Sequence, residues 1–165
     1  KYLEGFLKSN KFSDKEYTLD FIFAKYAVQK SNILLQMDIE GSEYEVILSC
    51  KEELLKKFKI IIIEFHYLSN YLINPANEIF QTVLKKLNKN HIPIHIHANN
   101  FTSPKYMKGI EIPNCIEVTY INREFFKITK ERKDQIYDNE LDKPCVCNNK
   151  EIYLKSWDLL MKKFI

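Results

Sequence analysis

Four consecutive isoleucines, at positions 60–63, constrain the fold of this chain more than any other feature. The run continues into Glu64, Phe65 and His66, and it is too apolar for a strand with one face in water. Strands that are apolar on both sides occur mainly in parallel sheets covered by helices on both faces. The sequence therefore predicts a central parallel strand over residues 59–66.

Helical and strand-like segments alternate on either side of this run. Apolar side chains recur with helical spacing in residues 19–27, 42–58 and 79–87. Thr18 is a suitable N-cap for the first helix, and Asn74 with Pro75 marks the start of the third. Short apolar segments predict further strands at 32–38, 92–96 and 116–121. The alternation indicates an α/β fold, in which the last two strands, joined by a loop, can pair antiparallel.

The overall composition limits the classes of partner. A chain of 165 residues is long enough for one domain with a real core. Its 25 basic and 22 acidic residues give a net charge of +3, which does not predict nucleic acid or an anionic membrane as a partner. No apolar run approaches the ~20 residues that span a bilayer, and no secretion signal is evident. We therefore expect a cytoplasmic protein whose cysteines are thiols. Cys145 and Cys147 are too close in sequence for a zinc knuckle.

Residues 37–46, with the sequence MDIEGSEYEV, are the most informative stretch for function. They follow the predicted strand at 32–38 and open the next helix. In open α/β sheets, ligands bind at the carboxyl ends of the strands. Asp38 and Glu40 are therefore expected at the mouth of a cleft, beside a helix end that favours anionic groups.

Asp38, Glu64 and His66 follow two strands that we expect to be neighbours, so their side chains can converge. Two carboxylates and an imidazole can hold Mg²⁺ or Mn²⁺, or act as a general base. The alternative is that these groups only cap helices and pair with nearby lysines. We favour a shared site, because ligands collect at the carboxyl ends of strands.

Other polar residues nearby have both structural and functional interpretations. Glu40 and Glu43 begin a helix, where the helix dipole alone favours acids, so capping explains them as well as function does. Gly41 predicts a positive φ or a close approach of the turn. Three histidines are predicted to share one face of the strand at 92–96, which suggests a metal site: His91, His95 and His97. That interpretation is the weaker one, because no other ligands cluster with them in the sequence.

Several segments, taken together, resemble one enzyme family. Residues 34–46, LLQMDIEGSEYEV, resemble the Asp-x-Glu-Gly-x-Glu signature of FkbM-type methyltransferases. Residues 62–66 resemble the next strand of that family, and residues 97–100 and 116–120 resemble its last two strands. Residues 18–20 resemble the lead-in to the helix before the signature. Five matches in the same order, over residues 18–121, are more specific than any one of them alone.

The resemblance implies a fold, a reaction and a set of residues. The fold would be a Rossmann-like sheet of seven strands, of which this chain would supply the fourth to the seventh. The reaction would transfer a methyl group from S-adenosylmethionine to an oxygen atom of a small molecule or a glycan, in some enzymes with Mg²⁺ or Mn²⁺. The implied residues are Asp38, Glu40 and Gly41 for the cofactor, His97, Asn99 and Asn100 for the acceptor, and Asp38, Glu64 and His66 for catalysis or a metal.

The chain lacks a glycine-rich turn that the family contains. The family's cofactor pocket begins with a glycine-rich turn after the first strand. This chain has only Gly5, Gly41 and Gly109, and it begins at Lys1 rather than at a methionine. We therefore expect a partial domain without the N-terminal strands, which binds S-adenosylmethionine weakly or not at all. Residues 1–165 would form a single domain, with the methyltransferase-like half at 18–121 and a peripheral tail at 122–165.

Two further consequences remain as predictions. The outer edge of the strand at 32–38 would have no neighbour, so it should pair with a second copy of the chain or be covered by the tail. The missing glycine turn also supports a second function, a non-catalytic interaction module of the same fold. A metal-dependent nuclease built on Asp38, Glu64 and His66 is a third, but it would need a lysine in place of His66 and a basic groove, and neither is evident.

Overall fold

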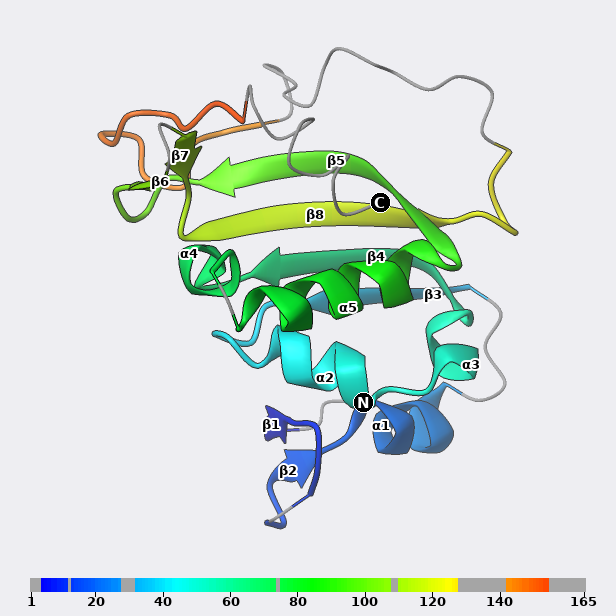
Figure 1. Ribbon diagram of the computed structural model, residues 1–165. Coiled ribbons are helices and arrows are strands. Elements are labelled where there is room, and N and C mark those ends of the chain that lie inside the picture. The colour runs from blue at the N-terminus through cyan, green and yellow to red at the C-terminus, as the bar shows by residue number, and fades with distance from the viewer. Residues whose placement is uncertain are drawn as a thin grey trace.

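A four-stranded mixed sheet forms the centre of the molecule (Figure 1). The computed structural model describes residues 4–11, 13–27, 32–73, 75–107, 110–127 and 142–154. In spatial order, the strands are β3 (Ile33–Met37), β4 (Phe58–Phe65), β8 (Cys115–Asn122) and β5 (His91–Asn99). β3 is parallel to β4, whereas β8 is antiparallel to both β4 and β5. The α/β prediction and the antiparallel pairing of the last two predicted strands are therefore confirmed.

Helices cover one face of this sheet. α2 (Glu43–Ser49) and α5 (Asn77–Asn88) lie side by side on that face (Figure 1). β4 turns Ile61, Ile63 and Phe65 towards them, and all three are fully buried. On the opposite face Ile60 and Ile62 are only half-buried. β4 is therefore central, as predicted, but it is parallel only to β3 and antiparallel to β8. The prediction that both its faces are fully covered is wrong for the described residues.

Several short elements complete the described fold. The remaining helices are α1 (Leu19–Tyr26), α3 (Glu52–Leu55) and α4 (Leu68–Tyr71). β1 (Phe6–Leu7) pairs in parallel with β2 (Glu16–Tyr17), and β6 (Lys105–Met107) pairs antiparallel with β7 (Ile110–Ile112). Sequence periodicity missed these four strands, because two or three residues carry no readable pattern. Among the described residues, no helix has the length and apolar character that a membrane span requires.

The helix predicted over 42–58 is broken in the structure. α2 ends at Ser49, and Cys50 has an extended backbone before α3 begins at Glu52. Lys86 of α5 donates hydrogen bonds to the carbonyl oxygens of Leu48, at 2.7 Å, and of Cys50. A cation at these last carbonyl groups stabilises the end of the helix. The contact comes from another helix, so the hydrophobic pattern of residues 42–58 does not predict it.

The predicted starts of two helices have different outcomes. Thr18 is the N-cap of α1, and its hydroxyl oxygen accepts a hydrogen bond from the backbone N–H of Phe21 at 3.2 Å. That prediction is confirmed. Asn74, the predicted cap of the third helix, lies outside the described residues, and α5 begins at Asn77.

A β-bulge in β5 separates the three histidines of that strand. The register between β5 and β8 shifts between Pro93 and His95. This extra residue puts His91 on the helix-covered face, while His95 and His97 stay on the opposite face. Within the described parts of the chain, no cluster of possible metal ligands includes any of these histidines. The prediction that the three share a face is therefore wrong, because a bulge reverses the alternation.

Burial of His91 predicts an acid-sensitive fold. The ring is fully buried, its Nε2 lies 3.0 Å from the carbonyl oxygen of Phe58, and burial lowers the pKa of the imidazole below its ordinary 6.5. The unfolded chain then binds a proton more readily than the folded chain, so stability is complete above pH 6.5 and is lost as the pH falls below it.

We expect the free energy of unfolding to fall between pH 7.5 and pH 5 more steeply for the wild type than for His91→Gln. The difference should be about 1.4 kcal/mol for each unit by which the folded pKa lies below the unfolded pKa. Urea unfolding of both proteins across this range measures the two slopes. Parallel curves would show that His91 titrates alike in the folded and unfolded states.

Candidate functional site

His66 directly follows β4 and lies among three carboxylates. Its Nε2 is 3.7 Å from Oδ1 of Asp38 and 3.5 Å from Oε2 of Glu40, and its Nδ1 is 3.0 Å from Oε1 of Glu43. The imidazole is buried, whereas the side chains of Asp38 and Glu40 are 55% and 81% exposed. The structure thus brings Asp38 and His66 together, as the sequence predicts, and it adds Glu40 and Glu43.

Glu43 orients the imidazole. The residue is fully buried, and its Oε1 also accepts hydrogen bonds from the backbone N–H groups of Ile39 and Gly41, both at 3.1 Å. A carboxylate at Nδ1 favours the tautomer in which Nδ1 carries the hydrogen. Nε2 is then the acceptor, and a proton taken up there would lie close to Asp38 and Glu40. The arrangement suits a general base.

The turn that carries these acids is tightly constrained. Glu40 and Gly41 both have positive φ values, 55° and 103°. A Cβ atom on Gly41 would lie 2.6 Å from the ring of Tyr67, so this position combines a positive φ with a close approach, and the prediction for Gly41 is confirmed. The hydroxyl of Tyr44 donates to the backbone carbonyl oxygen of His66 at 2.8 Å. Burial raises the pKa of Tyr44, which keeps the phenol protonated as this donor.

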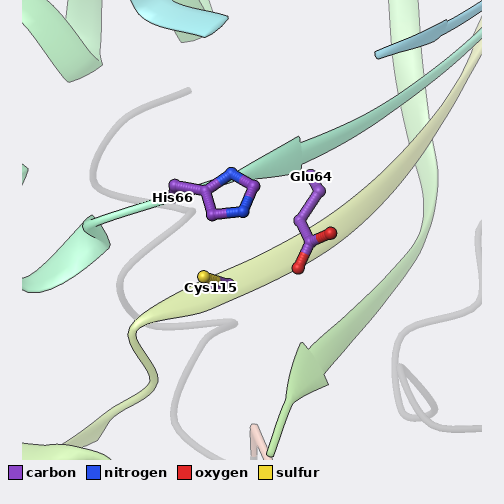
Figure 2. Close-up of side chains that lie close together, drawn as sticks. All are labelled: Glu64, His66 and Cys115. Carbon is purple, nitrogen blue, oxygen red and sulfur yellow. The ribbon is translucent and has the colours of Figure 1, made fainter. Parts of the chain in front are cut away.

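Glu64 and Cys115 lie on another side of His66 (Figure 2). Burial raises the pKa of the Glu64 carboxyl, although Asn99 donates a hydrogen bond from Nδ2 to its Oε1 at 2.7 Å. Burial also raises the pKa of the Cys115 thiol, to about 11. Asn99, predicted to bind the acceptor, therefore lies at the same edge as the predicted catalytic residues.

Among the residues that the structure describes, the possible metal ligands form two groups that share His66. One consists of Asp38, Glu40 and His66, the other of Glu64, His66 and Cys115, and within each the ligand atoms lie within 4.8 Å of one another. Asp38 and Glu64, which the sequence suggests as joint ligands of Mg²⁺ or Mn²⁺, fall in different groups. Because the two groups share only His66, an ion bound to His66 would be held by the ligands of one group or of the other.

Sequence reasoning missed Cys115, which looks like an incidental thiol. A usable signal was present, however. If the last strand runs antiparallel to its neighbours, it begins at the edge where β4 ends. Cys115 is the first residue of β8 and therefore lies near Glu64 and His66.

The other two predicted acceptor residues contact a distant part of the chain. His97 Nε2 lies 3.2 Å from Oε1 of Glu151, and the side chain of Asn100 bonds to Val146 and Asn149. The segment 142–154 also contributes three buried side chains, Asp142, Ile152 and Leu154. In this structure, therefore, residues of the predicted tail engage His97 and Asn100.

Asn100→Ala should release this segment. Asn100 Nδ2 donates to the carbonyl oxygens of Val146 and Asn149, at 3.1 and 3.3 Å, and Oδ1 accepts from the backbone N–H of Val146 at 2.9 Å. Losing these buried bonds should weaken docking by about 1–3 kcal/mol. Limited proteolysis should then cut within 142–154 about 5- to 140-fold faster, since each 1.4 kcal/mol is a factor of ten. Asn148→Ala, at an exposed neighbouring position, is the control, and equal cleavage of the two variants would contradict the docking role.

Comparison with known proteins supports one family. The pattern described as the Methyltransferase FkbM domain matches residues 10–102, more than half of the chain. The match includes the 37–46 stretch, His66 and residues 97–100, while β8 lies beyond it. No curated protein and no solved structure matches the chain. Because the family pattern covers most of the sheet and the turn around His66, the chain belongs to the FkbM methyltransferase domain family.

Proposed function

We propose that this chain is part of an S-adenosylmethionine-dependent O-methyltransferase that acts on a hydroxyl group of a sugar or metabolite. The observation that carries the proposal is His66, a buried imidazole oriented by the buried Glu43 and placed at the carboxyl edge of the sheet. It lies within the region that matches a methyltransferase family. A base at this edge is what deprotonation of an acceptor hydroxyl requires.

The proposed mechanism assigns a role to each side chain around His66. Bound S-adenosylmethionine supplies an electrophilic methyl group. His66 takes the proton of the acceptor hydroxyl at Nε2, and Glu43, 3.0 Å from Nδ1, stabilises the resulting imidazolium. Asp38 and Glu40 add negative charge on the Nε2 side. Glu64, held by Asn99, can accept a hydrogen bond from the acceptor and position it, and positioning supplies much of the rate.

The described residues fit only one side of the cofactor. Asp38 and Glu40 offer exposed carboxylates that can accept hydrogen bonds from hydroxyl or amino groups, beside the turn at Gly41. The glycines in the described ranges are Gly5 and Gly41, and they do not form a glycine-rich strand-to-helix turn. We therefore propose that the chain represents the carboxyl half of the methyltransferase domain and that other polypeptide completes the cofactor pocket.

Calorimetry with S-adenosylmethionine tests this proposal. The ligand is titrated into this chain and into the longest natural polypeptide that contains it. We expect saturable binding to the longer polypeptide and little or no heat with this chain alone. If neither binds, the methyltransferase proposal is wrong, and an interaction module of the same fold becomes the better explanation. If this chain alone binds tightly, the partial-domain proposal is wrong.

We also propose that the outer edge of β3 pairs with a second copy of the chain. Among the described residues, β3 pairs only with β4, and Leu34 on this strand is 52% exposed. An open apolar edge promotes strand pairing, and a lysine there opposes it. Sedimentation velocity should show a dimer for the wild type and a monomer for Leu34→Lys. A monomeric wild type would contradict this pairing.

A reducing compartment is the proposed location. All four cysteines are free, and Cys145 and Cys147 are exposed. Exposed thiols of this kind persist in the cytoplasm, which supports a cytoplasmic protein. Alkylation of Cys145 and Cys147 by a thiol reagent in intact cells would test this location, and resistance of both residues to the reagent would contradict it.

A further inference from the structure

Glu64, His66 and Cys115 face a common space at one edge of the sheet (Figure 2). Glu64 belongs to β4, His66 follows it directly, and Cys115 opens the antiparallel strand β8. One oxygen, one nitrogen and one sulfur atom from these residues lie within 4.8 Å of one another. His66 and Cys115 are buried and Glu64 is half-buried, so the surrounding protein restricts the movement of all three side chains.

Each of the three side chains is also held by a neighbour through another contact. Glu43 Oε1 lies 3.0 Å from His66 Nδ1, so Nε2 remains for a ligand. Asn99 donates to Oε1 of Glu64, which leaves Oε2, and Asn114 Nδ2 lies 3.5 Å from the sulfur of Cys115. A carboxylate at the far nitrogen of a histidine is the usual support for a metal-binding imidazole, since it fixes the tautomer and the ring orientation.

The spacing suits a tetrahedral ion after a small contraction. Zinc bonds of about 2.0–2.3 Å to oxygen, nitrogen and sulfur place tetrahedral ligand atoms roughly 3.3–3.8 Å apart. Because the three ligand atoms lie within 4.8 Å of one another, each pair needs to approach by at most about 1–1.5 Å. Three protein ligands would leave the fourth position open to water or a substrate oxygen, as in catalytic zinc sites.

We propose that Glu64, His66 and Cys115 bind one zinc ion, or another thiophilic divalent cation, with an open fourth position. The thiolate of Cys115 is the soft ligand that selects zinc over magnesium, and its proton passes to solvent on binding. The second group, Asp38, Glu40 and His66, has no sulfur, and both of its carboxylates are largely exposed. Zinc would occupy the lone pair of His66 Nε2 that the proposed base uses, so the zinc-bound state and the base-competent state of His66 exclude each other.

Cobalt titration tests the site, because Co²⁺ replaces Zn²⁺ and reports a sulfur ligand through a charge-transfer band in the near ultraviolet. The protein carries Cys145→Ser and Cys147→Ser, which remove the two exposed thiols. We expect one Co²⁺ per chain, a sulfur band, and displacement by Zn²⁺. Cys115→Ser should abolish the band and raise the Kd for Zn²⁺ by about 100-fold or more, above the 10–100-fold effect of losing an outer-shell partner.

Two control variants locate the site. Cys50→Ser removes a buried thiol outside the cluster, so it should leave the band and the Kd unchanged. Glu40→Gln removes a possible ligand that belongs to the other group alone, so it should keep the sulfur band and one Co²⁺ per chain. The proposal is overturned if the wild type binds no ion, if the band is absent, or if Glu40→Gln abolishes binding. Should Cys115→Ser not fold, X-ray absorption of the zinc-loaded protein decides, through one sulfur neighbour at about 2.3 Å or none. No S-adenosylmethionine is present, so failure here is distinct from failure of the methyltransferase proposal.

Discussion

Replacing Glu43 with alanine is expected to lower the free energy of unfolding by about 3–5 kcal/mol, because it leaves three hydrogen-bonding groups without their partner, at about 1–3 kcal/mol for each buried one. Oε1 of Glu43 accepts hydrogen bonds from the backbone N–H groups of Ile39 and Gly41 and faces His66 Nδ1 at 3.0 Å. The alanine variant leaves two backbone donors and an imidazole without this partner. The turn at residues 38–42 should therefore lose its order.

Glu45 offers a matched control for this prediction. It lies in the same first turn of α2, but its side chain is exposed. Glu45→Ala should change the free energy of unfolding by less than about 1 kcal/mol, the usual range for a charge near a helix end. Urea unfolding of both variants measures the difference. Equal losses would show that Glu43 contributes only its charge at the helix end rather than its buried contacts.

The fold could be predicted from the sequence where hydrophobic periodicity is strong. The isoleucine run became the central strand β4, and the strands at 32–38 and 116–121 were found within one residue of their bounds. Long-range contacts set the features that were missed. Lys86 ends α2 from another helix, and a bulge after Pro93 reverses the side-chain alternation of β5. Neither the Lys86 hydrogen bond nor the bulge can be recognised from the local sequence pattern.

Part of the candidate site could be predicted from the sequence, and the part that depends on long-range packing could not. Asp38 and His66 converge because two parallel strands end at one edge, a rule that the sequence pattern can apply. Glu43 looked like a helix-capping acid, and its burial against His66 depends on how α2 packs on the sheet. His97 and Asn100 engage residues more than forty positions away, and pattern reasoning does not place so distant a segment.

His66→Asn should remove most of the catalytic rate while leaving the cofactor affinity intact. Asparagine is polar and similar in size, but it cannot take up a proton near neutral pH. Loss of a general base lowers kcat by about 10²–10⁴-fold. His95→Asn is the control, because this second histidine is partly exposed and pairs with Asp142 at 2.9 Å, in the docked segment. In the longer polypeptide that binds the cofactor, calorimetry should give the same affinity for S-adenosylmethionine in the wild type and both variants.

Transfer of a labelled methyl group from S-adenosylmethionine to a mixture of sugar and other hydroxyl acceptors tests the central claim most directly. The assay uses the polypeptide that binds the cofactor and compares the wild type, His66→Asn and His95→Asn. We predict label on acceptor oxygen with the wild type and His95→Asn, and a rate about 10²–10⁴-fold lower with His66→Asn. Transfer by His66→Asn at the wild-type rate would contradict the assignment of His66 as the base.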